Sequence, residues 1–183
     1  MQRLLLVGVG LTLMGCKGDT TAPTGVASGS LSFSYTGAGG AATYSASGSA
    51  PGIGGTSPGT VPWAAAHRDA TTQSIVVSAA IPRTSSTWDI AAVNLERLTV
   101  GSNTFDSSCT AQCPFVGVSF GATLDAASYQ FVCLLTSGTV AITSVSSTRV
   151  VGTFSGTGDC GDSTGVSSAF TVTSGSFDVP LVG

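Results

Sequence analysis

Short stretches in which apolar and polar residues alternate recur along most of the chain, and they constrain the fold more than any other feature. Leu31, Phe33 and Tyr35, for example, alternate with two serines. Equivalent runs follow at residues 75–81, 91–95, 116–120, 129–135, 140–142, 150–154, 170–172 and 177–181. Because successive side chains of a strand point to opposite faces of a sheet, this period of two predicts strands with one buried face.

Glycine, serine, asparagine and aspartate separate nearly all of these runs, and no amphipathic helix is indicated. We therefore expect an all-β fold: an antiparallel β-sandwich, or a flattened barrel, of about nine or ten short strands, with a meander in its second half. The stretch 64–70 and the pair Ala126-Ala127 are the only segments compatible with a helical turn. Residues 49–62 are rich in glycine and proline and predict a long loop.

The N-terminus has the pattern of an export signal. Arg3 precedes an apolar run, residues 4–14, which is too short to span a bilayer and is typical of a signal peptide. The run ends in Leu13-Met14-Gly15-Cys16, which resembles the lipobox of bacterial lipoproteins. This resemblance implies cleavage before Cys16 and attachment of several acyl chains to Cys16, which anchor a protein stably where a single chain does not.

The same resemblance divides the chain into three parts. Residues 1–15 are expected to be a lipoprotein signal peptide, residues 16–29 the lipidated cysteine and a flexible tether, and residues 30–183 a single β-sandwich domain. Lys17 stands where an aspartate would imply retention in the inner membrane, so the resemblance favours the outer membrane of the cell envelope. Whether the domain faces the periplasm or the cell surface stays open.

The sparse charge of the chain limits its partners. Charged residues make up 8% of the chain, and loss of Arg3 with the signal peptide leaves five basic and nine acidic residues. The basic residues are scattered singly, so no nucleic-acid partner is expected. We expect contact with the membrane through the N-terminal lipid, a protein or glycan partner that the sequence does not specify, and no cofactor.

Four cysteines remain besides Cys16: Cys109, Cys113, Cys133 and Cys160. An even number in an exported chain predicts two disulfides, for which three pairings exist. If the strands between residues 116 and 154 form a meander, the cysteines gather at one end of the sheet. This placement favours Cys109–Cys113 and Cys133–Cys160 and leaves the crossed pairings open. A four-cysteine zinc site is the alternative, but the chain has only one closely spaced ligand pair.

His67, Asp89 and Ser163 follow the chain order of the catalytic residues in chymotrypsin-like serine proteases. The segments Ala65-Ala66-His67, Asp89-Ile90-Ala91 and Gly161-Asp162-Ser163 resemble those of that family. The resemblance implies Ser163 as nucleophile, His67 as general base and Asp89 as the group that orients the imidazole. Thr164 stands where the family has glycine, and the tail after Ser163 is short. We therefore expect no working triad.

Two further pairs of residues are candidates for binding. Asp159 and Asp162 offer carboxylates to a calcium ion, but they lack the usual ligand spacing, and acids in glycine-rich loops commonly form turns. Trp63 follows the Gly/Pro-rich segment and Trp88 follows a Ser/Thr cluster. Exposed tryptophans there would contact a sugar or a protein, whereas the alternative places both in the core.

The second half of the chain resembles uncharacterised β-sandwich lipoproteins of bacteria. The resemblance rests on residues 150–156, VVGTFSG, and residues 174–179, SGSFDV. It implies a sandwich fold and no assigned activity. We therefore expect a membrane-anchored extracytoplasmic lipoprotein with a binding or structural role. The alternative is a compact or degenerate serine hydrolase that uses His67, Asp89 and Ser163.

Overall fold

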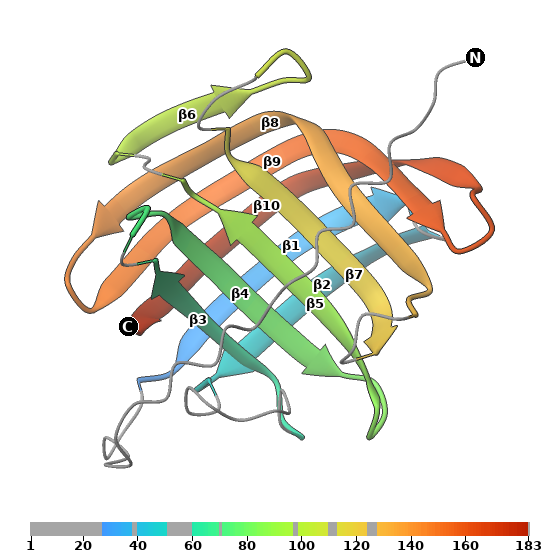
Figure 1. Cartoon of the computed structure of the whole chain (residues 1–183), viewed down its shortest axis with the longest axis horizontal. Coiled ribbons are helices and arrows are strands. Elements are labelled where there is room, and N and C mark those ends of the chain that lie inside the picture. Colours follow the sequence, from blue (N-terminus) through green and yellow to red (C-terminus); the bar gives the residue numbers. More distant parts are fainter. Residues whose placement is uncertain are drawn as a thin grey trace.

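The computed structural model describes residues 27–37, 40–50, 60–69, 71–96, 99–109, 113–123 and 128–182. These residues form ten β-strands and no helix (Figure 1), which confirms the expected all-β class. The strands are β1 (Gly29–Gly37), β2 (Gly40–Gly48), β3 (Trp63–Arg68), β4 (Ile75–Pro82), β5 (Thr87–Asn94), β6 (Gly101–Phe105), β7 (Phe115–Thr123), β8 (Phe131–Val145), β9 (Arg149–Asp162) and β10 (Ser167–Val182). A search of the described part for a helix able to cross a membrane finds none.

Seven of the strands close into a barrel. Hydrogen bonds join them in the cyclic order β10-β3-β4-β5-β7-β8-β9, and every pair in this ring is antiparallel except β10–β3. A sandwich would need two separate antiparallel sheets, so the pairing is that of a closed barrel with extra strands. The meander expected in the second half is present as β7-β8-β9-β10.

Two short seams close the barrel at its two ends. β10 pairs with β3 only at Leu181 and Val182, and the hairpin β1–β2 extends the sheet from the remainder of β10. β7 pairs only with the first part of β8, residues 131–134. Further along β8, at residues 138–142, the neighbouring strand is β6. Figure 1 shows the consequence: β3, β4, β5 and β7 cross in front of a layer made by β8, β9, β10, β1 and β2. We name the end at which β1 begins and β3, β5 and β10 finish the entry end, and the other the far end.

Aromatic side chains fill the space between the two layers. Phe33 of β1 stacks on Tyr44 of β2 at a ring-centroid distance of 4.9 Å and contacts Phe154 of β9 at 5.8 Å. The Tyr44 hydroxyl lies 3.0 Å from the carbonyl oxygen of Ala79 in β4 and 3.1 Å from that of Asp89 in β5, and its single proton is shared between these two acceptors. Burial raises the pKa of Tyr44 far above its ordinary value, so the hydroxyl stays a neutral donor. The β1–β2 hairpin is therefore part of the core.

Several strand boundaries differ from the predicted ones. Residues 131–135 of the first run and the run at 140–142 lie in the single strand β8, and the runs at 170–172 and 177–181 lie in β10. The pairing shifts register between Leu135 and Ser137 in β8 and between Val172 and Gly175 in β10. Each shift interrupts the alternation of apolar and polar residues, so the sequence predicts two strands where the structure has one. β2, β3 and β6 are absent from the predicted set, and β3 covers most of the stretch considered for a helical turn. Residues 1–26, 51–59 and 124–127, which include Cys16 and Ala126-Ala127, lie outside the described residues.

Candidate functional site

Both favoured disulfides are present, Cys109–Cys113 and Cys133–Cys160. Cys133 of β8 and Cys160 of β9 are register partners and are buried. The expectation that all four cysteines gather at one sheet end is wrong, because Cys133 lies opposite Val118 inside β7 whereas Cys113 precedes that strand. Sulfur atoms held in disulfides are not thiolates, so these four are not zinc ligands in this state.

The structure does not bring His67, Asp89 and Ser163 together. His67 lies at the entry end of β3, and its Nδ1 is 3.2 Å from the carbonyl oxygen of Val182, the last residue of β10. Ser163 lies in the turn that precedes β10, at the far end of that strand. The span of β10 therefore separates them, a path of roughly 40–50 Å along the strand. A working triad needs contacts of about 3 Å.

The Asp89 carboxylate contacts residues of the barrel wall and not the His67 imidazole. Its carboxylate pairs with Arg83 at 2.6 Å and accepts a hydrogen bond from the backbone N–H of Gly121 at 2.9 Å. Gly121 has a φ of 62°, and the pairing of β5 with β7 shifts register at this point. The carboxylate thus satisfies an N–H that the irregular ladder leaves without a cross-strand partner.

Of the two calcium candidates, Asp162 forms a turn. Its Oδ1 accepts hydrogen bonds from the Thr164 hydroxyl at 2.6 Å, the Thr164 N–H at 2.8 Å and the Val166 N–H at 3.0 Å. The Thr164 hydroxyl, with these backbone N–H groups, lowers the pKa of Asp162 below its ordinary value. Asp159 is exposed on β9. The described residues contain no group of three or more side chains able to hold a metal ion.

The Asp162 turn makes the stability of the domain sensitive to acid. Because the folded pKa lies below the unfolded value, the stabilisation is complete above the unfolded pKa and is lost as the pH falls through the folded pKa. We expect the free energy of unfolding to fall between about pH 5 and about pH 2, and to fall less in Asp162→Ala. Urea unfolding of the wild type and of Asp162→Ala across this pH range measures the free energy of unfolding. Ser163→Ala, in the same turn, should keep the wild-type profile; an unchanged profile for Asp162→Ala would refute the assignment.

Neither tryptophan belongs to the core cluster of the barrel. Trp63 alternates with Ala64, which belongs to the core, and lies opposite Ala80 of β4. Trp88 lies in β5 opposite Pro82 and is only 2% exposed, although it is not part of the core cluster. Trp88 is therefore not an exposed binding residue. Trp63 is half-buried, and its indole Nε1 has no hydrogen-bond partner among the described residues.

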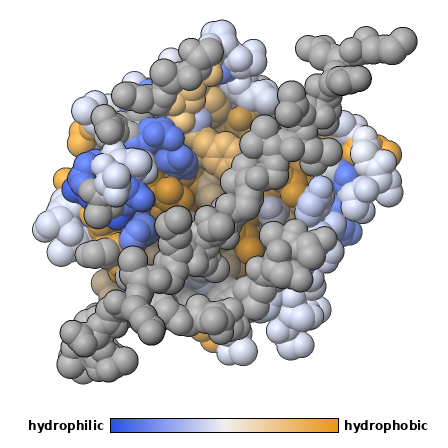
Figure 2. All heavy atoms as spheres, in the orientation of Figure 1, coloured by the Kyte–Doolittle hydropathy of each residue, from blue (hydrophilic) through white to orange (hydrophobic). Residues whose placement is uncertain are grey.

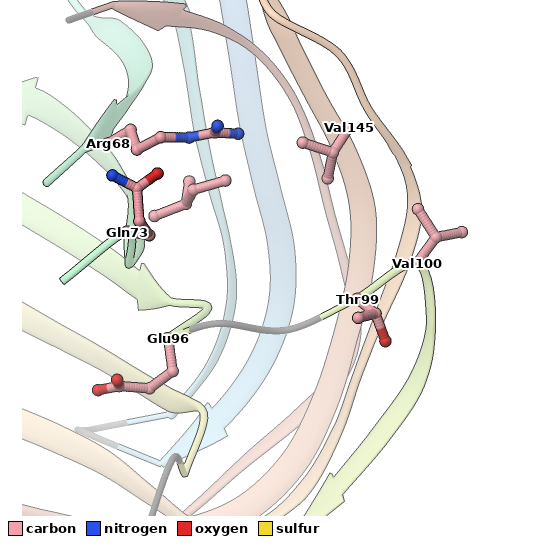
Figure 3. Close-up of a pocket in the computed structure, with 7 residues that line it drawn as sticks. Arg68, Gln73, Glu96, Thr99, Val100 and Val145 are labelled. Atoms are coloured by element: carbon pink, nitrogen blue, oxygen red, sulfur yellow. The ribbon is translucent and has the colours of Figure 1, made fainter. Parts of the chain in front are cut away.

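A hollow of about 640 Å³ opens at the entry end (Figure 3). Its described lining comprises one cation, one carboxylate, two neutral polar side chains and three aliphatic ones: Arg68, Glu96, Gln73, Thr99, Ile75, Val100 and Val145. Figure 2 shows strongly hydrophilic residues gathered on the side where the β3–β4 turn and the end of β5 lie in Figure 1, beside hydrophobic surface. The volume lies within the range of small-molecule sites in proteins, but the hollow is open to solvent, so a bound ligand would stay partly exposed.

Arg68 occupies a position at which a core residue is expected. It continues the inward-facing row of β3 that Ala64 and Ala66 begin, and it lies opposite Ile75 of β4. In Figure 3 its guanidinium extends into the hollow, whereas the Glu96 carboxylate points away from it. Among the described residues Arg68 has no ion-pair partner, and its buried Nε has no hydrogen-bond acceptor. An unneutralised guanidinium at the mouth of an apolar core is costly and favours an incoming anion.

Backbone strain is concentrated at the same hollow. Gln73, with φ of 62°, and Glu96, with φ of 45°, are the non-glycine residues of the described part that adopt a left-handed backbone. The Asn94 side chain holds Glu96 through two hydrogen bonds, at 2.9 Å to its N–H and 3.0 Å to its carboxylate. Such conformations cost free energy in L-residues and are frequent at functional sites.

Sequence interpretation did not single out Arg68. The residues of β3 after Trp63 are three alanines, a histidine and an arginine, which is too short and too weakly apolar an alternation to predict a strand. The alternation of Ala64, Ala66 and Arg68 was nevertheless a usable signal, since it places the arginine on the same face as the two alanines. Glu96, Thr99 and Val145 line the hollow because strands from different parts of the chain meet there. No local sequence pattern indicates this.

Comparison of the chain with protein-family models, with curated proteins and with solved structures gives no match.

Proposed function

We propose that this protein is a lipid-anchored component of the bacterial cell envelope, most consistent with the outer membrane, whose barrel serves as a binding module. The observation that carries the proposal is the sequence Leu13-Met14-Gly15-Cys16, which resembles a lipobox, with the tether that follows it. Two disulfides support an oxidising compartment outside the cytoplasm. The placement of His67, Asp89 and Ser163 offers no support for the hydrolase alternative.

The attachment of the tether to the barrel supports an anchored arrangement. The carbonyl oxygen of Ser28 accepts hydrogen bonds from Arg149 at 3.4 and 3.5 Å, and Arg149 also pairs with Asp178. The first residues of the described chain are thus held at the entry end of the barrel. From Cys16 to Gly29 the chain can reach at most about 45 Å, which keeps this end close to a membrane that holds Cys16.

Metabolic labelling with palmitate tests the anchor. In a Gram-negative host the wild-type protein should incorporate the label and appear in the membrane fraction, because Cys16 is the proposed acylation site. Cys16→Ser should take up no label and should retain residues 1–15, since cleavage follows acylation in lipoproteins. Lys17→Ala is the matched control for processing and should be labelled normally. Label in Cys16→Ser, or none in the wild type, would contradict the proposal.

A further inference from the structure

We infer that the hollow at the entry end is a binding site for a small organic carboxylate, recognised by Arg68. This inference rests on the proposed binding function and names the class of ligand. It starts from the charge of the hollow: its described lining carries one guanidinium and one carboxylate, and the two point in different directions. Among the described residues no ion pair joins Glu96 to Arg68, and the Glu96 carboxylate accepts a hydrogen bond from the Asn94 amide.

A guanidinium is well suited to a planar carboxylate. Its N–H groups form a rigid fork that matches two carboxylate oxygens, and such charged pairs bind more strongly than neutral hydrogen bonds. The Nε of Arg68 is buried and has no acceptor in the described part of the chain, whereas the end of the guanidinium extends into the hollow in Figure 3 and would meet an incoming anion. Arg68 is therefore the group that fixes the acidic end of the ligand.

The rest of the lining selects a singly charged ligand with an apolar part. Ile75, Val100 and Val145 supply aliphatic surface, and Val100 is 60% exposed, so its burial by a ligand would be favourable. A phosphate monoester carries about two negative charges and is commonly held by several cations or backbone N–H groups. Among the described lining residues Arg68 is the one cation, so a dianion would keep one charge without a partner. A monocarboxylate with a short aliphatic group fits this set.

The proposal is tested on the full-length lipidated protein in detergent, by methyl NMR with N-acetylvaline as the probe. The methyl signals of Ile75, Val100 and Val145 should shift in a saturable manner, with a dissociation constant on the order of 1 mM. N-acetylvalinamide, which has the same shape without the charge, and inorganic phosphate should cause no saturable shift. Arg68→Gln should weaken N-acetylvaline binding about tenfold or more, because the charged pair is lost.

Arg83→Gln removes the same charge at the opposite end of β4 and should bind N-acetylvaline as the wild type does. Equal shifts with the amide, undiminished binding in Arg68→Gln, or no saturation at about ten times the expected dissociation constant would overturn the inference. Acylation of Cys16 is measured separately in the same samples, from the mass of the N-terminal peptide. Loss of binding with an acylated Cys16 would refute the ligand class alone, and binding without acylation would refute the anchor alone.

Discussion

Replacing Cys133 and Cys160 together by alanine is expected to lower the free energy of unfolding by about 3–4 kcal/mol. The bridge closes a loop with a sequence separation of 27, and it joins β8 to β9 between two buried side chains. Its loss therefore returns considerable entropy to the unfolded chain. Urea unfolding of the oxidised wild type and of the double variant measures the difference.

The other disulfide provides the matched control. Cys109 and Cys113 are separated by only 4 in sequence, so replacing both by alanine should cost less, about 2 kcal/mol. Cys109 is also exposed, and little packing is lost there. A larger loss for the Cys109–Cys113 pair than for the Cys133–Cys160 pair would contradict the placement of the buried bridge within the barrel wall.

Phe33→Ala should destabilise the domain by about 3–5 kcal/mol. Phe33 is 2% exposed and contacts Tyr35, Tyr44 and Phe154, so its removal leaves a cavity where β1, β2 and β9 meet. The effect is informative because β1 and β2 lie outside the closed ring of seven strands. If the hairpin were only an appendage, the loss would be small and the barrel would unfold as in the wild type.

The control for Phe33→Ala is an apolar truncation on the surface. Val166 lies in the β9–β10 turn and is 65% exposed, so Val166→Ala should change the free energy of unfolding by no more than about 0.5 kcal/mol. Phe33→Leu, which keeps most of the apolar volume, should fall between the two. Equal effects of Phe33→Ala and Val166→Ala would show that Phe33 does not belong to the core.

The sequence predicted the class of the fold because alternation is a local property. Leu31, Phe33, Val77 and Val93 are all buried, as the period of two requires. Closure of the barrel was not predictable in this way, since it depends on a contact between strands that are remote in sequence, the pair of β3 with β10. The number of strands agreed with expectation partly by compensation, because split predictions for β8 and β10 offset the missing β2, β3 and β6.

The disulfide pairing shows the same limit. The favoured pairs are present, but the geometry used to choose them is wrong, because Cys133 and residues 140–142 share one strand. The candidate site was less predictable still. Arg68 faces the hollow because of its place in the β3 alternation, whereas Val145 approaches it only through the ladder that joins β8 to β9.

Mass spectrometry of the N-terminal peptide, after extraction of the protein from its own envelope, tests the central claim most directly. The account predicts a chain that begins at Cys16 and carries the added mass of several acyl chains, with residues 1–15 removed. A chain that retains Met1, begins at another residue, or carries an unmodified Cys16 would contradict it.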